Sequence, residues 1–128
     1  MIEVSAPTDA RYWGWTLYNG WSETLDYANR QTSLNFRQSH VDPDGKIRLV
    51  LSAEVPGVAN WLDTRGHSSG FLAWRVTSPV EPEKPEGRVV DFGGLKGELP
   101  EYTRWISRAG RREIIHRRQR HVAWRYAD

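Results

Sequence analysis

Alternating apolar and polar positions predict three strands of similar length. Residues 11–18, 46–52 and 71–77 are rich in aromatic or aliphatic side chains, and an apolar residue recurs at every second position. A period of two puts the apolar side chains of each strand on one face, where they can be buried. The three apolar faces comprise Trp13, Trp15 and Leu17, then Ile47, Leu49 and Leu51, and finally Leu72, Trp74 and Val76.

Turn-forming residues separate these segments and suggest how they connect. The sequence Asp42-Pro43-Asp44-Gly45 stands between residues 36–41 and 46–52. Because Pro43 fixes φ and Gly45 readily adopts a positive φ, this sequence predicts a β-hairpin between the two flanking segments. Residues 78–88 are rich in proline and charge, which indicates an extended linker. A short final strand is expected at residues 88–92.

The chain changes to helical patterning at Leu99. Leu99, Tyr102, Trp105 and Ile106 share one face of a helix, and Pro100 suits its first turn. Gly110 is expected to interrupt this helix, and a second helix follows over residues 111–125. We therefore expect a β-sandwich domain over residues 1–98 and a helical tail over residues 99–128.

The tail carries the basic charge of the chain. Residues 1–98 hold ten basic and thirteen acidic side chains, a net charge of −3, whereas residues 99–128 hold eight arginines and three acids, a net charge of +5. Because the β part is acidic, the pattern favours a tail that packs on its own domain or on a partner, and it does not favour nucleic-acid binding. From Leu99 to Tyr126 the tail could contact a second copy or a companion domain.

Composition narrows the class of protein further. The chain has seven tryptophans, which usually fill a compact β core or line a groove. It has no cysteine, which excludes disulfides and thiolate metal sites and suits a reducing compartment such as the cytoplasm. We see no signal peptide and no apolar run that approaches the ~20 residues of a membrane span, so no membrane association is expected.

The polar run at residues 60–67 is one candidate site. Asp63 and His67 could act as an acid–base pair, and Trp61 could form a stacking wall. The alternative is a structural corner, in which Asn60 and Asp63 bond their own backbone and Trp61 fills the core.

The polar run at residues 26–35 is a second candidate site. Asn29, Arg30 and Gln31 offer amides and a guanidinium, the groups that commonly hold a carboxylate or a sugar. An ordered loop without a ligand would also explain them. The two runs together predict ligand-binding residues Asn29, Arg30, Gln31, Asn60, Trp61, Asp63 and His67.

Metal and cofactor motifs are not found in the sequence. His116 and His121 are five positions apart, so they do not share a helix face as a metal pair would. The sequence Asp42-x-Asp44-Gly45 resembles the start of a calcium loop, but the required downstream acid is replaced by Ala53. We also find no phosphate-binding loop, dinucleotide fingerprint or nucleophile elbow. We therefore predict no metal and no cofactor.

Four sequence blocks in residues 11–77 resemble the bacterial domain-of-unknown-function family 1214. The blocks are Tyr12-Trp13-x-x-x-Leu17-Tyr18, Leu25-Asp26-Tyr27-x-Asn29-Arg30-Gln31-Thr32-Ser33-Leu34-Asn35, Val41-Asp42-x-Asp44-Gly45 and Pro56-Gly57-Val58-x-Asn60-Trp61-Leu62-Asp63-Thr64-x-Gly66-His67. The resemblance implies a jelly-roll-like β-sandwich, and it implies no assigned reaction. Full-length members are longer and are often joined to a second domain, so the chain could be free-standing, a fragment or half of a split protein.

Three functions are consistent with this sequence. The favoured hypothesis is a non-catalytic binding module for a small polar or carbohydrate-like ligand. The second is a hydrolase-type enzyme or enzyme subunit that uses Asp63 and His67, assisted by Arg30. The third is an oligomerisation or protein-interaction module that acts through the C-terminal helix.

Overall fold

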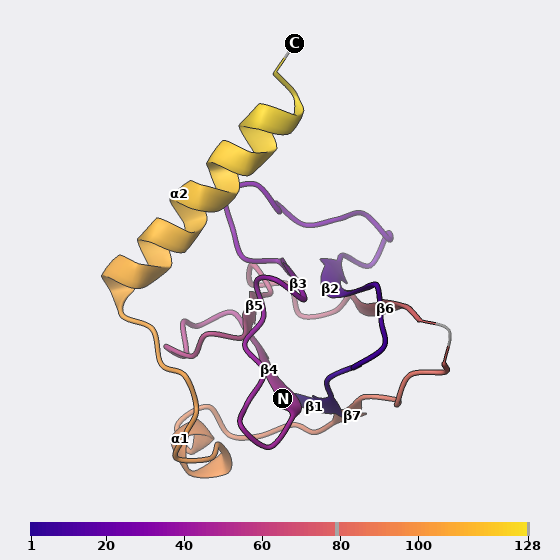
Figure 1. The fold of residues 1–128 in the computed structure, drawn as a ribbon. Coiled ribbons are helices and arrows are strands. Elements are labelled where there is room, and N and C mark those ends of the chain that lie inside the picture. The colour runs from indigo at the N-terminus through magenta and orange to yellow at the C-terminus, as the bar shows by residue number, and fades with distance from the viewer. Residues whose placement is uncertain (79, 128) are drawn as a thin grey trace.

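The computed structural model describes residues 1–78 and 80–127, which form two sheets and a C-terminal helix. Figure 1 shows the long helix running beside the β part, with the C-terminus at its far end. The strands are β1 (Ile2–Ser5), β2 (Tyr12–Tyr18), β3 (Ser33–Asn35), β4 (Lys46–Ser52), β5 (Trp61–Asp63), β6 (Phe71–Thr77) and β7 (Glu86–Gly87). The helices are α1 (Leu95–Glu98) and α2 (Arg108–Arg125).

One sheet has three antiparallel strands in the order β3-β2-β6, and the other has four strands in the order β5-β4-β1-β7. In the first sheet β2 pairs along its whole length with β6, from Tyr12 opposite Thr77 to Tyr18 opposite Phe71. In the second sheet β4 is antiparallel to β1 and parallel to β5. The three strands predicted from alternation are β2, β4 and β6, and they are confirmed.

Apolar side chains from both sheets pack into one core. Trp15 of β2 stacks on Trp74, its partner on β6, with ring centroids 4.0 Å apart. The buried members of this core are Val4, Trp13, Trp15, Leu17, Leu25, Leu34, Ile47, Leu49 and Leu62. Since every one of the three predicted apolar faces contributes to it, the alternation located the core correctly. A jelly roll has eight strands in two Greek keys, whereas the described chain has seven strands in two sheets. The jelly-roll classification therefore stays a prediction.

A second, smaller apolar cluster covers the other face of the four-stranded sheet. Val50 of β4 and Trp61 of β5 are register partners, and they pack with Val58, Leu95 and Leu99. Because successive side chains of a strand point to opposite faces, β4 contributes Leu49 to the main core and Val50 to this cluster. The segment after β7 therefore folds back and covers this face of the four-stranded sheet.

The predicted hairpin at residues 36–52 is wrong. The turn itself forms, because Gly45 has φ +80° and its N–H donates to the carbonyl of Asp42 at 2.9 Å. Its first arm is not a strand, however, because the side chain of Asn35 accepts hydrogen bonds from the N–H groups of Arg37 and Gln38. Such local bonds compete with a strand ladder, and β4 pairs with β1 instead.

The predicted helix that starts at Leu99 is also wrong. The chain around Trp105 forms a bridge with Val58, and the N–H of Ile106 donates to the carbonyl of Gly57 at 2.7 Å. Helix α2 begins only after Ser107, whose hydroxyl accepts from the N–H of Gly110 at 3.1 Å. Gly110 therefore lies in the first turn of α2 and does not interrupt it. The strand expected at residues 88–92 is likewise absent from the described chain, where β7 ends at Gly87.

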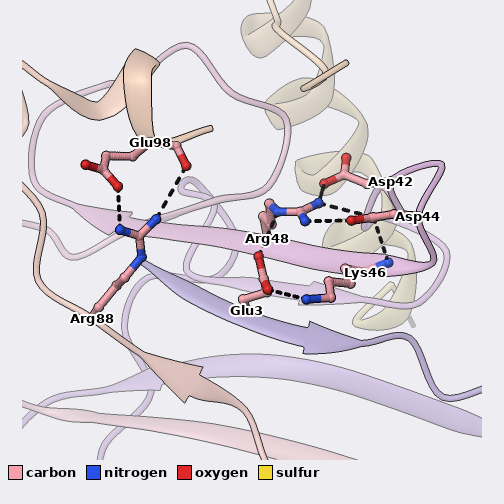
Figure 2. A network of polar contacts seen from close by, with 7 residues as sticks. All are labelled: Glu3, Asp42, Asp44, Lys46, Arg48, Arg88 and Glu98. Carbon is pink, nitrogen blue, oxygen red and sulfur yellow. Dashed lines mark hydrogen bonds and ion pairs between the residues drawn. The ribbon is translucent and has the colours of Figure 1, made fainter. Parts of the chain in front are cut away.

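An ion-pair network ties β1, β4 and the turn at residues 42–45 together (Figure 2). The guanidinium of Arg48 contacts Glu3 at 2.8 Å, Asp42 at 2.7 Å and Asp44 at 2.6 Å. Lys46 also binds Glu3, at 2.6 Å. The hydrogen bond from Arg48 is the main reason that the pKa of Asp44 lies far below its ordinary value. This cluster of charges is internally paired, so it stabilises the fold and offers no open site.

Candidate functional site

The two polar runs singled out from the sequence lie against each other in the structure. Arg30 Nη1 is 2.8 Å from Asp63 Oδ2, and the N–H of Asp63 donates to the carbonyl of Gln31 at 2.9 Å. The runs are thus neighbours, but their polar groups are largely used on one another.

Gln31 and Asn60 are buried side chains that hold backbone segments together. The Gln31 amide donates to the carbonyls of Ala59 at 3.1 Å and Trp61 at 2.5 Å. The Asn60 side chain donates to the carbonyl of His40 at 2.7 Å and accepts from its N–H at 2.8 Å. Both amides therefore hold backbone segments of the chain together. The sequence showed that these side chains are polar, but it did not show that their partners lie within the chain.

Asp63 and His67 are not brought together by a hydrogen bond or an ion pair in the described residues. Asp63 Oδ1 accepts from the N–H of Arg65 at 2.8 Å, and its other oxygen binds Arg30. Arg65 and Gly66 both have positive φ, and this tight turn carries His67 out to the surface. The acid–base pair stays a prediction, and Asp63 is engaged in holding the turn.

Trp61 and Asn29 are also occupied by contacts within the chain. The indole N–H of Trp61 donates to the carbonyl of Ser52 at 3.1 Å, and the guanidinium carbon of Arg111 lies 5.2 Å from its ring centroid. Asn29 accepts from Gln119 of α2 at 3.0 Å. Trp61 therefore lies within the second apolar cluster and does not form an open stacking surface.

Two arginines of α2 reach into the β part. Arg111 donates to the side-chain oxygen of Gln31 and to the carbonyl of Val58, and Arg118 donates to the carbonyl of Ser33 at 2.6 Å and to its hydroxyl at 3.0 Å. Burial lowers the pKa of both arginines, and the charge of Arg111 lowers that of Arg118 further. Residue type does not distinguish these two arginines from the others of the tail, but their spacing of seven puts them on one helix face.

A cavity of about 460 Å³ lies beside these arginines. It is bounded by α2, by the turn that follows β3 and by the extended chain before α2. Its lining comprises Gln31, Leu34, Asn35, Arg37, Gln38, Ser39, His40, Ala59, Arg104, Ile106, Ile114, Arg117, Arg118 and His121. Of the seven ligand-binding residues predicted from the sequence, Gln31 alone lines this cavity. The other six do not line it, and six of its fourteen lining residues come instead from α2 and the chain before it.

Two buried polar atoms on this wall have no hydrogen-bond partner in the described structure. They are the hydroxyl oxygen of Ser39 and Nε of Arg118. Arg118 is only 8% exposed, so water cannot readily satisfy it. Buried polar groups are normally paired, so these two atoms are exceptions, and they belong to residues that line the cavity.

His67 lies in a separate hollow of about 240 Å³, with Thr64, Gly70 and Phe71 among its lining residues. No residue lines both this hollow and the larger cavity. Within residues 1–78 and 80–127, no three His, Cys, Asp or Glu side chains gather as metal ligands. No helix in the same ranges is long and apolar enough to cross a membrane.

A family model described as "Protein of unknown function (DUF1214)" matches residues 1–81. The match spans more than half of the chain, so the chain belongs to this family. It is also similar to an uncharacterised protein from Burkholderia cenocepacia whose crystal structure is known, with 36% sequence identity and a TM-score of 0.70. That similarity covers 73% of this chain and 26% of the other, so the matched part spans about a quarter of the Burkholderia chain. No curated protein matches the sequence.

Proposed function

We propose that this chain is a non-catalytic binding module that holds a small polar ligand in the cavity beside α2. The observation that carries the proposal is the lining of this cavity, which brings the polar side chains of Gln38, His40, Arg104 and Arg117 around one space. A volume of about 460 Å³ is in the range of sites for small molecules. The wall mixes apolar side chains such as Leu34 and Ile114 with amides and guanidinium groups, the usual make-up of such a site.

The same wall gives less support to catalysis. It carries no carboxyl group in the described structure, and Ser39 Oγ makes no hydrogen bond to a base, although His40 and His121 line the same cavity. A serine needs an adjacent base to become a nucleophile. Asp63, the carboxylate of the enzyme hypothesis, is held by Arg30 and by the turn at Arg65.

Nuclear magnetic resonance of the whole chain tests this proposal with glucose, succinate and glucose 6-phosphate as probes. We expect at least one probe to shift the signals of Leu34, Ile106 and Ile114, because these line the cavity. The probes themselves should stay chemically unchanged. Shifts confined to Thr64, His67 and Phe71, or conversion of a probe, would favour the enzyme hypothesis, and no shift with any probe would refute the binding module.

A second candidate function is self-association through the end of α2. Trp124 is 82% exposed and Tyr126 is 67% exposed, and exposed aromatics in one place often mark a contact surface. Arg111 and Arg118 already hold α2 to the β part, and Trp124 lies beyond both of them, so we expect the contact surface at this end of the helix.

Light scattering during size-exclusion chromatography tests self-association. We expect the chain to elute as a dimer and the Trp124→Ser variant to elute as a monomer, since the indole is the largest exposed apolar group on α2. Ala123→Ser is the control on the same turn and should leave the dimer intact. A monomeric wild-type chain would exclude this function.

Two finer expectations accompany the proposal. A cytoplasmic location remains our prediction, because a chain without cysteine suits a reducing compartment. A jelly-roll arrangement of the strands also remains our prediction, and the two-sheet core is compatible with it.

A further inference from the structure

We infer that the ligand of the cavity is a small oxyanion, a molecule with a phosphate or carboxylate group that the arginines around the cavity hold. This inference rests on the proposed function and specifies its ligand. It follows from the geometry of α2, from the charge of the wall and from the hydrogen-bond donors that line the cavity.

Helix geometry aims several basic side chains at the cavity. Ile114, Arg117, Arg118 and His121 recur at intervals of three and four residues, so they lie on one face of α2. All four line the cavity. This face therefore brings the guanidinium of Arg117 and the imidazole of His121 to the cavity, while the guanidinium of Arg118 donates to Ser33 within the wall.

Two other segments add an arginine each. Arg104 lies on the extended chain before α2, which is fixed because the N–H of Ala59 donates to the Arg104 carbonyl at 2.8 Å. Arg37 lies on the turn that the side chain of Asn35 holds. Four arginines from three segments of the chain thus converge on one cavity.

The charge of this wall is not balanced by acids of the described chain. Arg30, Arg48, Arg88 and Arg120 each form an ion pair with a carboxylate. Arg37, Arg104, Arg117 and Arg118 form none with residues 1–78 or 80–127, and the cavity lining contains no acidic residue. A bound anion would supply the missing negative charge, and guanidinium groups match the planar or tetrahedral oxygens of carboxylate and phosphate.

The groups that line the cavity include more charged hydrogen-bond donors than charged acceptors, and two of the lining residues also have a buried atom without a partner in the described structure. Arg118 Nε is a donor and cannot accept, and the Ser39 hydroxyl can donate as well. Burial and the nearby Arg111 charge lower the pKa of Arg118. A neutral hydroxyl oxygen accepts from at most two donors, whereas an oxyanion accepts from more donors and also stabilises the positive charge.

Isothermal titration of the whole chain at constant ionic strength tests the inference. The probes are glucose 6-phosphate, inorganic phosphate and succinate. Glucose, which lacks the phosphate group, is the uncharged control for glucose 6-phosphate. We expect glucose 6-phosphate to bind at least about tenfold more tightly than glucose, the change that a single charge-assisted hydrogen bond produces. Comparison of phosphate with succinate identifies which oxyanion the cavity prefers.

Substitutions locate the binding. Arg117 and Arg104 are exposed, so Arg117→Gln and Arg104→Gln should fold normally, as checked by circular dichroism. Each should weaken glucose 6-phosphate binding by about tenfold. Arg112→Gln is the matched control, because Arg112 is an exposed arginine of α2 that does not line the cavity, and its affinity should stay within about twofold of wild type.

The outcomes separate this inference from the proposed function. Equal affinity for glucose and glucose 6-phosphate, unaffected by Arg117→Gln, would overturn the oxyanion inference and leave the binding module standing. No binding of any probe would overturn both. Binding of a single-stranded oligonucleotide alone, weakened as much by Arg112→Gln as by Arg117→Gln, would also overturn it and would assign the arginines to nucleic-acid backbone.

Discussion

At the scale of the residue, buried polar side chains are satisfied by partners far away in the sequence. Gln31 is 2% exposed, and its oxygen accepts from Arg111, eighty positions later. Asparagine, glutamine and aspartate were singled out from the sequence because they can bind ligands. The sequence could not show that Asn60 would face His40 or that Asp63 would face Arg30, because long-range pairing is decided by the fold.

Replacement of Gln31 by alanine should strongly destabilise the chain. It removes the hydrogen bonds from Gln31 to the carbonyls of Ala59 and Trp61 and one of the two hydrogen bonds of the Arg111 guanidinium, and it opens a cavity. We expect the free energy of unfolding to fall by about 3 kcal/mol, measured by urea denaturation. Gln119→Ala, which loses an exposed hydrogen bond, should cost no more than about 1 kcal/mol. An equal loss in both variants would contradict this role of Gln31.

Gly70 is required by close packing. A Cβ at this position would lie 2.3 Å from the carbonyl oxygen of Tyr18, a backbone atom that cannot rotate away. We expect Gly70→Ala to lower the free energy of unfolding by about 2–3 kcal/mol. Gly97→Ala is the control, because a Cβ in α1 would meet nothing within 4 Å and should be neutral or stabilise by up to about 1 kcal/mol. A thermal unfolding series compares the two variants, and an unchanged Gly70→Ala would refute the clash.

At the scale of the element, the strands with a clear period were predictable and the short ones were not. Strands β2, β4 and β6 have seven residues each, long enough for an apolar face to repeat. Strands β3, β5 and β7 have two or three residues, too few to show a period. The apolar spacing from Leu99 to Ile106 favoured a helix. In the structure, however, the backbone of Arg104 and Ile106 forms hydrogen bonds with Ala59 and Gly57 instead.

The network around Arg48 should make stability depend on acid pH. The hydrogen bond from Lys46 lowers the pKa of Glu3, and that from Arg48 lowers the pKa of Asp44. When a folded pKa lies below the unfolded value of about 4, the stabilisation is fully present above pH 4 and is lost as pH falls further. We therefore expect Arg48→Gln to be less stable than wild type near neutral pH, with the difference shrinking as the pH falls below about 4.

Denaturant unfolding at a series of pH values measures this difference. Arg75→Gln is the control, because Arg75 is exposed on β6 and forms no ion pair within the described residues. Its stability should run parallel to wild type at every pH. A constant difference between wild type and Arg48→Gln down to low pH would show that the network acts by packing alone.

At the scale of the whole molecule, α2 is fastened to the β part by side chains rather than by an apolar seam. The described contacts run through Arg111 and Arg118, which donate to Gln31, Val58 and Ser33. The sequence indicated a basic helix that packs on its own domain or on a partner. It did not indicate which arginines would be buried, because buried and solvent-exposed arginines look the same in the sequence.

This attachment should make the helix and the sheets unfold together. We expect the far-ultraviolet helical signal and tryptophan fluorescence to follow one thermal transition in the wild-type chain. Arg118→Leu removes the charged hydrogen bonds to Ser33, so we expect a loss of about 2–3 kcal/mol and a helical signal that melts before the fluorescence. Arg112→Leu, on an exposed position, should keep a single transition. Separate transitions in the wild-type chain would contradict the coupling.

The bond between Gln31 and Arg111 also has a consequence for biosynthesis. Eighty residues separate the two side chains, and at ~5–20 residues per second a ribosome needs on the order of ten seconds to make them. During this interval the nascent β part carries an amide oxygen that its final partner has not yet reached, and the cavity is open on the side that α2 will cover. A chaperone present at that time would meet a surface that the finished protein conceals.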